Sequence, residues 1–119
     1  DHAAGFACHL TDEERQRRLA TRDRNYSVEA FASKGRSAFY GQQEKSRPLT
    51  TFDLVRWCKT QFPIAVRSWL QRFSRVTTGV VLAELARIPR PHATEVAVAF
   101  SEKLLSVNLT VLLAIGEES

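Results

Sequence analysis

The chain has 119 residues, of which 44% are hydrophobic and 25% charged, and its formal net charge is +4. A chain of this length forms one domain or one subunit of a larger assembly. The hydrophobic fraction, with only 5 glycines and 4 prolines, excludes a disordered tail and a fibrous protein. Cys8 and Cys58 form no Cys-x-x-Cys motif, which excludes a disulfide scaffold and a cysteine-based metal site.

The positive charge is concentrated in residues 1–90, which hold 16 Lys and Arg against 9 Asp and Glu. Such a segment suits nucleic acid, an anionic membrane surface or an acidic protein partner. Arginine outnumbers lysine 13 to 4, which favours forked contacts to carboxylates and phosphates. The chain begins at Asp1 and contains no methionine, so we expect a processed mature chain or an excised fragment.

Residues 1–46 are expected to form a soluble docking extension. The run Thr11–Glu14 has the form of a capping box, which predicts a short, strongly charged helix from Asp12 to about Arg24. This helix has almost no apolar face, so we expect it to lie on a surface or against a partner. The glycine, serine and glutamine content of residues 25–46 predicts a loop with one helical turn at most.

Residues 47–119 are expected to form a second, helical region, so the fold class is predicted to be all-α. After a short helix at about 52–59, the hydrophobic pattern predicts a long helix over 64–88, which begins after Pro63 and ends at Pro89. A last helix is predicted to begin at Thr94 or Ala93 and to run to about Ile115, with Gly116 as its C-terminal stop.

The two long predicted helices have about 25 and 22 residues, enough at 1.5 Å per residue to cross a bilayer core of about 30 Å. We therefore expect a membrane hairpin. Four charged residues disfavour contact with lipid and should face a protein neighbour or lie at the bilayer edges: Glu84, Arg87, Glu102 and Lys103.

No glycine-rich phosphate loop, Gly-x-Ser-x-Gly or His-Glu-x-x-His motif occurs, so the chain is not expected to be catalytic alone. The informative order is Arg47-Pro48-Leu49, Phe62-Pro63-Ile64, Ser68 to Arg72, and Thr77-Thr78-Gly79-Val80. This order resembles the entry to the first membrane helix of the cytochrome b subunit of succinate dehydrogenase (respiratory complex II), its larger membrane anchor.

The resemblance covers residues 47–82 and departs from the family at two points. Gln71 stands where the family usually has histidine, and the Thr-Gly pair lies a few residues late. Either Arg72 or Arg75 therefore matches the family arginine, and Arg72 keeps the four-residue spacing from Ser68.

The resemblance implies a membrane-anchor subunit that contributes to ubiquinone binding and to electron transfer from the iron–sulfur subunit to quinone. The implied partners are the iron–sulfur subunit, the flavoprotein subunit, a second small membrane anchor, accessory subunits and membrane lipid, but not nucleic acid. The implied location is the mitochondrial inner membrane, with the basic N-terminal side in the matrix, as the positive-inside rule favours.

Ser68 and Arg72 lie one above the other on a helix face. We expect Ser68 to donate to a quinone oxygen and Arg72 to stabilise the negative charge that the ring gains on reduction. Trp69 is expected to form one wall of the pocket for the quinone ring. Alternatively, the arginines anchor a helix end among anionic headgroups. Haem b would require an axial ligand, and His92 is the only candidate, although such a histidine more often caps a helix or lies on the surface.

Two other functions fit parts of the sequence. In the first, the helices over 64–88 and 94–115 form an antiparallel hairpin in a soluble interaction module or accessory subunit. In the second, the basic cluster at 67–75 belongs to a small nucleic-acid-binding domain. That cluster has no interleaved aromatic platform and no recognisable docking motif, which disfavours the second.

Overall fold

The computed structural model describes residues 8–41 and 47–118, and it is mostly helical with one small antiparallel sheet. The mostly helical class is confirmed, whereas a purely α fold is wrong because the sheet is present. In chain order the elements are α2 (Asp12–Ala20), α3 (Val28–Ser33), β1 (Arg36–Tyr40), β2 (Pro48–Thr50), α4 (Thr51–Gln61), α5 (Pro63–Phe73), α6 (Thr78–Ala86), the 3-10 turn η1 (Arg90–His92) and α7 (Glu95–Glu117).

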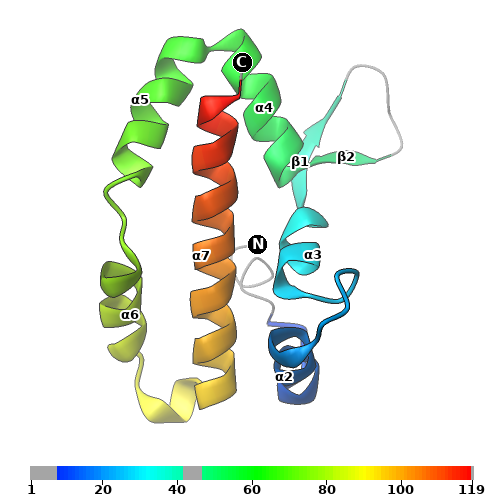
Figure 1. Ribbon diagram of the computed structural model, residues 1–119, viewed down its shortest axis with the longest axis vertical. Coiled ribbons are helices and arrows are strands. Elements are labelled where there is room, and N and C mark those ends of the chain that lie inside the picture. The colour runs from blue at the N-terminus through cyan, green and yellow to red at the C-terminus, as the bar shows by residue number, and fades with distance from the viewer. Residues whose placement is uncertain (1–7, 42–46, 119) are drawn as a thin grey trace.

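The central element is α7, which contacts each of the other five α-helices (Figure 1). In Figure 1, α2 and α3 lie on one side of α7, while α5 and α6 lie on the other. The core gathers around α7, with Phe100 and Ile115 fully buried. Phe31 of α3 meets Phe100 edge-on, with ring centroids 5.6 Å apart. Burial of this apolar stripe is the main source of stability for such short surrounding helices.

The helix starts follow the capping residues that the sequence predicts. The Thr11 hydroxyl accepts from the Glu14 amide, and the Glu14 carboxylate accepts from the Thr11 amide, so the capping box is confirmed. This helix ends at Ala20 rather than near Arg24, because the backbone becomes extended at Thr21. Thr94 caps α7 in the same way by accepting from the Ala97 amide.

The small sheet lies where the sequence predicts a loop. Its register pairs Arg36 with Thr50 and Tyr40 with Pro48, so the two strands pair across the expected boundary between residues 46 and 47. Side chains reinforce the pairing, because the Ser37 hydroxyl donates to the Leu49 carbonyl at 2.9 Å.

The predicted single helix over 64–88 is wrong. It is divided into α5, which ends at Phe73, and α6, which begins at Thr78. The division occurs because Thr77 has an extended backbone and its hydroxyl accepts from the Val80 amide, which starts a new helix. The described residues therefore do not form the predicted hairpin of two long helices.

Gly116 does not stop the last helix but lies inside α7. A Cβ atom there would lie 2.9 Å from the Leu70 side chain of α5, so the glycine permits a close approach between the helices. The helix ends one residue later, at Glu117, where Lys59 of α4 donates to the Ile115 and Glu118 carbonyls. A cation at this position satisfies the free carbonyls at a helix C-terminus.

Candidate functional site

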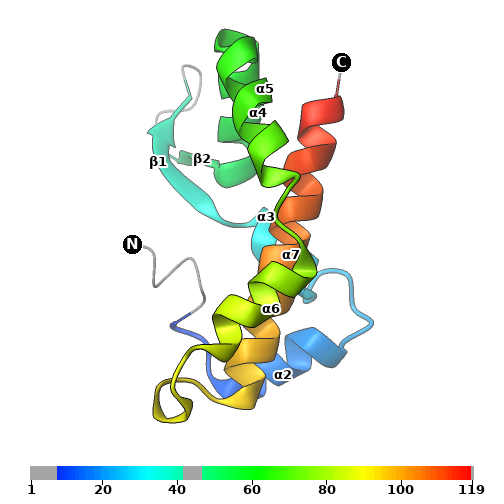
Figure 2. The same cartoon turned by 90° about the vertical axis from the view of Figure 1, so that its left-hand side faces the viewer.

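The predicted site residues lie on α5, whose orientation follows from one buried side chain. Pro63 begins the helix at a position that tolerates proline, and Leu70 is buried against Gly116 of α7. The opposite face of α5 consequently points away from α7, on the outside of the molecule (Figure 2). Ser68 and Arg72 are exposed on this outer face.

The structure brings two of the predicted residues, Trp69 and Arg72, into contact. The guanidinium carbon of Arg72 lies 5.0 Å from the centroid of the Trp69 ring, within the range of a cation–π contact. Trp69 remains 59% exposed, so its ring is available to a ligand. Ser68 lies four residues before Arg72 and shares its side of the helix. This surface offers a hydroxyl, a guanidinium with fixed donors and an aromatic face.

The surroundings of this surface are positively charged. Residues 54–83 contain five Lys and Arg residues and no Asp or Glu. Among the residues that the structure describes, no carboxylate forms an ion pair with Arg67, Arg72 or Arg75. By contrast, the Glu118 carboxylate hydrogen-bonds Arg56 on the neighbouring helix and raises the pKa of that guanidinium. Arg67 lines a pocket with Glu117 on the side of α5 towards α7, whereas Arg72 and Arg75 keep their positive charge available for an external anion.

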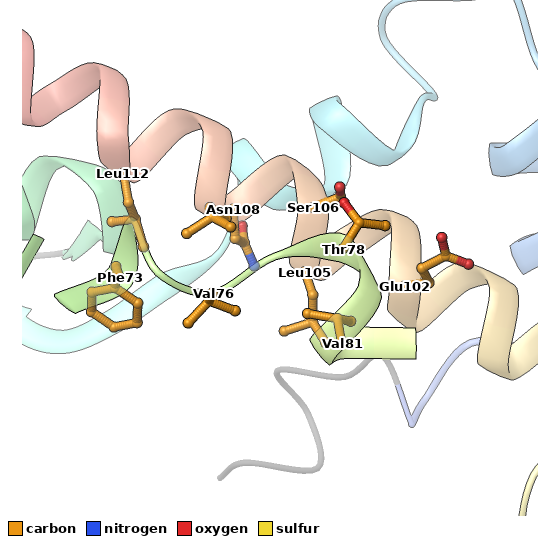
Figure 3. Close-up of a pocket in the computed structure, with 10 residues that line it drawn as sticks. Phe73, Val76, Thr78, Val81, Glu102, Leu105, Ser106, Asn108 and Leu112 are labelled. Carbon is orange, nitrogen blue, oxygen red and sulfur yellow. The ribbon is translucent and has the colours of Figure 1, made fainter. Parts of the chain in front are cut away.

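A cavity of about 280 Å³ lies between α7 and the segment that joins α5 to α6. In Figure 3, Phe73, Val76 and Val81 lie across it from Leu105 and Leu112 of α7. Its remaining lining residues are Thr78, Glu102, Ser106, Asn108 and Leu109, so polar groups occur among apolar walls. An apolar cavity with a few polar groups is the usual form of a small-molecule site.

This cavity is not evident from the sequence, because it depends on the interruption between α5 and α6. The available signal was the spacing of Leu105, Leu109 and Leu112, which places them on one face of a helix. Phe73 joins the cavity to the predicted site, because it lies one helical turn beyond Trp69.

His92 lies in the η1 turn between α6 and α7, near the end of the molecule opposite α5 (Figure 1). Its imidazole is exposed. A haem ligand requires an apolar pocket around the macrocycle, which an exposed turn does not supply. No group of three or more His, Cys, Asp or Glu residues suited to a metal occurs within 8–41 and 47–118. Haem b with His92 as its axial ligand stays a prediction.

One helix, α7, is long and apolar enough to cross a membrane by length and composition, although a core helix of a soluble protein meets the same criteria. In the described arrangement α2 and α3 pack against α7. Lys103 of α7 pairs with Glu29 of α3 at 3.3 Å. Glu84 and Arg87 pair with each other at 3.4 Å, so three of the four charges expected to need an external neighbour are paired within the chain.

No family model matches this sequence, and comparisons with curated proteins and with solved structures gave no match either.

Proposed function

We propose that this chain is a membrane-anchor subunit of a succinate dehydrogenase assembly and contributes to its ubiquinone site in the mitochondrial inner membrane. The observation that carries the proposal is the clustering of Ser68, Trp69 and Arg72 on the exposed outer face of α5. The proposed partners are the flavoprotein, iron–sulfur and second anchor subunits, which supply the oxidation of succinate and the electrons. Among the described residues, α7 is the helix long and apolar enough to cross the bilayer.

In this proposal, the quinone ring lies against the Trp69 indole. The Ser68 hydroxyl donates a hydrogen bond to one ring oxygen, and the Arg72 guanidinium donates to the oxygen on which negative charge develops. A fixed cation at that position stabilises the charged state more than the neutral one, which favours reduction. The cavity beyond Phe73 supplies an apolar space for the tail of the quinone.

The first test is to purify the native assembly in mild detergent and identify the proteins that accompany this chain. We expect a flavoprotein and an iron–sulfur protein, together with succinate–quinone reductase activity. A chain that purifies alone, or with proteins that lack this activity, contradicts the proposal.

The second test separates the two candidate arginines. In the assembly, Arg72→Gln should lower kcat/KM for quinone by about 100-fold, because it removes a charged donor to the developing anion. Ser68→Ala should lower it by about tenfold, as expected for one hydrogen bond. Arg75→Gln, which removes the same charge three residues away, should leave it nearly unchanged.

Succinate oxidation with a soluble artificial acceptor should stay constant in all three variants, which shows that the assembly is intact. If only Arg75→Gln lowers kcat/KM for quinone, Arg75 is the arginine of the quinone site. Full quinone reduction in all three variants would refute the proposed site.

A soluble helical interaction subunit is the second candidate, and the packing of α2 and α3 on α7 favours it. The first turn of α2 carries Asp12, Glu13 and Glu14, a group that would be costly in lipid. If α7 crosses the bilayer, α2 and α3 must leave its sides. A disulfide between positions 29 and 103 (E29C/K103C) would then hold α3 against α7 and keep α7 out of the bilayer. Carbonate would extract the chain with the disulfide but not the reduced chain. In a soluble subunit the chain is extracted by carbonate with or without the disulfide.

A further inference from the structure

The outer side of α5 combines exposed apolar groups with arginines. Ile64 is 85% exposed, and Phe62 and Trp69 are each 59% exposed. Eight of the ten exposed large hydrophobic residues of the described chain lie within residues 57–88, so the exposure is concentrated in one region. We call Phe62, Ile64 and Trp69, with Arg72, Arg75 and, on the flank of α5 towards α7, Arg67, the basic–aromatic surface.

The lengths of the helices restrict how this region can meet a membrane. α5 has 11 residues, about 16 Å, and α6 has 9 residues, about 14 Å, whereas the hydrocarbon core is about 30 Å thick. Residues 74–77 leave the regular helix between them, and irregular backbone facing lipid is not tolerated in the hydrocarbon. Neither helix can span, but a short helix with aromatic and arginine side chains is suited to the interface.

The charge of the segment indicates which surface it would contact. Arg56 pairs with Asp53 and Glu118, and Lys59 donates to the end of α7, but no described carboxylate forms an ion pair with Arg67, Arg72 or Arg75, so these three arginines can attract anionic headgroups. A nucleic acid would neutralise the arginines but would leave Phe62 and Ile64 in water. An anionic bilayer satisfies both components, because phosphates contact the arginines while the acyl boundary covers the apolar groups.

We propose that the basic–aromatic surface docks on an anionic phospholipid bilayer, with α5 parallel to the membrane plane. Phe62, Ile64 and Trp69 enter the boundary between headgroups and acyl chains, and the arginines contact lipid phosphates. This attachment involves α5 and the residues beside it, so it does not depend on whether α7 crosses the bilayer or on the quinone site. Where that site exists, quinone from the bilayer reaches Ser68 directly from this layer.

The experiment uses Trp69 as a depth probe in the full chain. The chain has two tryptophans, so Trp57→Phe leaves Trp69 as the sole indole. The protein is mixed with vesicles of phosphatidylcholine alone, or of phosphatidylcholine with phosphatidylserine, that carry bromine either near the headgroup or at the chain end. We expect a blue shift and stronger quenching by the shallow bromines, with at least tenfold tighter binding to the anionic vesicles.

The triple variant R67Q/R72Q/R75Q should weaken binding to anionic vesicles by about 100-fold, because each arginine near the surface contributes about 1 kcal/mol. The matched control R22Q/R24Q/K34Q removes the same charge from exposed positions elsewhere and should weaken binding less than tenfold. Far-UV circular dichroism of both variants checks that the helical fold is retained.

Three results would overturn the docking proposal. Stronger quenching by the deep bromines would mean that α5 crosses the bilayer. An unchanged Trp69 spectrum with anionic vesicles would mean that this face contacts a protein or water. Equal losses in the two triple variants would mean that net charge alone drives binding. None of these results depends on succinate–quinone reductase activity, so the two proposals can fail separately.

Discussion

The two sides of α7 differ in how completely they are packed. On the α2 and α3 side, Val28 and Phe100 are almost fully buried, and apolar residues from four helices form one cluster. On the α5 and α6 side, Leu70 is the only buried residue of the two helices, and a cavity separates α6 from α7. The α2 and α3 side, which we call the packed side, stabilises the fold. The α5 and α6 side, which we call the open side, exposes apolar surface that only another molecule could bury.

The same difference appears in the arginines. Arg18 on the packed side lies 4.2 Å from the Tyr26 ring centroid and donates to the Tyr26 carbonyl at 3.2 Å. Its charge and its methylene groups are both used within the chain. Arg72 on the open side lies over the exposed Trp69 ring and forms no ion pair with any described carboxylate. Arginines with similar sequence context therefore stabilise the fold on one side and are available for recognition on the other.

The largest expected effect comes from truncating the packed side. Phe100→Ala should reduce the free energy of unfolding by about 3–5 kcal/mol, because it removes a fully buried ring that also meets Phe31 edge-on. Chemical denaturation monitored by circular dichroism measures this loss. Phe73→Ala is the matched control on the open side, where the ring is 41% exposed, and it should cost about 1 kcal/mol. Equal losses would show that the two sides are packed equally well.

The attachment of α5 to α7, on the open side, is tested at Gly116. Gly116→Val should cost about 1–3 kcal/mol, because its Cβ would lie 2.9 Å from the Leu70 Cδ1 atom and must displace α5. Combining it with Leu70→Ala makes room for the new side chain, so the double variant should be more stable than the sum of the single effects predicts. Strict additivity in this double-mutant cycle would mean that α5 does not approach α7 at Gly116.

The sequence was informative where a single side chain determines the local structure. Thr11 and Thr94 begin their helices as predicted, since a hydroxyl that accepts from an amide within the next turn acts locally. Thr77 has the same role, but the apolar pattern continued across it and predicted one helix instead of two. The small sheet was missed because β1 and β2 pair across an intervening loop, and such pairing depends on tertiary context.

The candidate site was predictable only in part. The four-residue spacing placed Ser68 and Arg72 on one helix face, and the structure brings Trp69 under Arg72. The outward direction of that face could not be predicted, because it depends on Leu70 packing against Gly116, far along the chain. The cavity has the same origin, since its walls come from α7 and from residues on both sides of the helix interruption.

The smallest expected effect concerns the ion pair that joins α3 to α7. Glu29→Gln should reduce the free energy of unfolding at neutral pH by about 0.2–1 kcal/mol, because exposed ion pairs contribute little. A hydrogen bond from its own backbone amide, with a further contribution from Lys103, lowers the pKa of Glu29 below its ordinary value of 4.5. The folded state therefore favours the charged carboxylate. Its contribution is fully present above the ordinary pKa and is lost as the pH falls through the lowered pKa.

The difference in stability between the original chain and Glu29→Gln should accordingly disappear on acidification from about pH 5 to pH 3. Denaturation curves at several pH values measure this convergence. Asp12, whose pKa is lowered by hydrogen bonds from Thr94 and Arg15, is retained in the variant. The variant should therefore still lose stability in acid, but less than the original chain. A difference that persists at pH 3 would mean that Glu29 stabilises the packed side by contacts that do not require its charge.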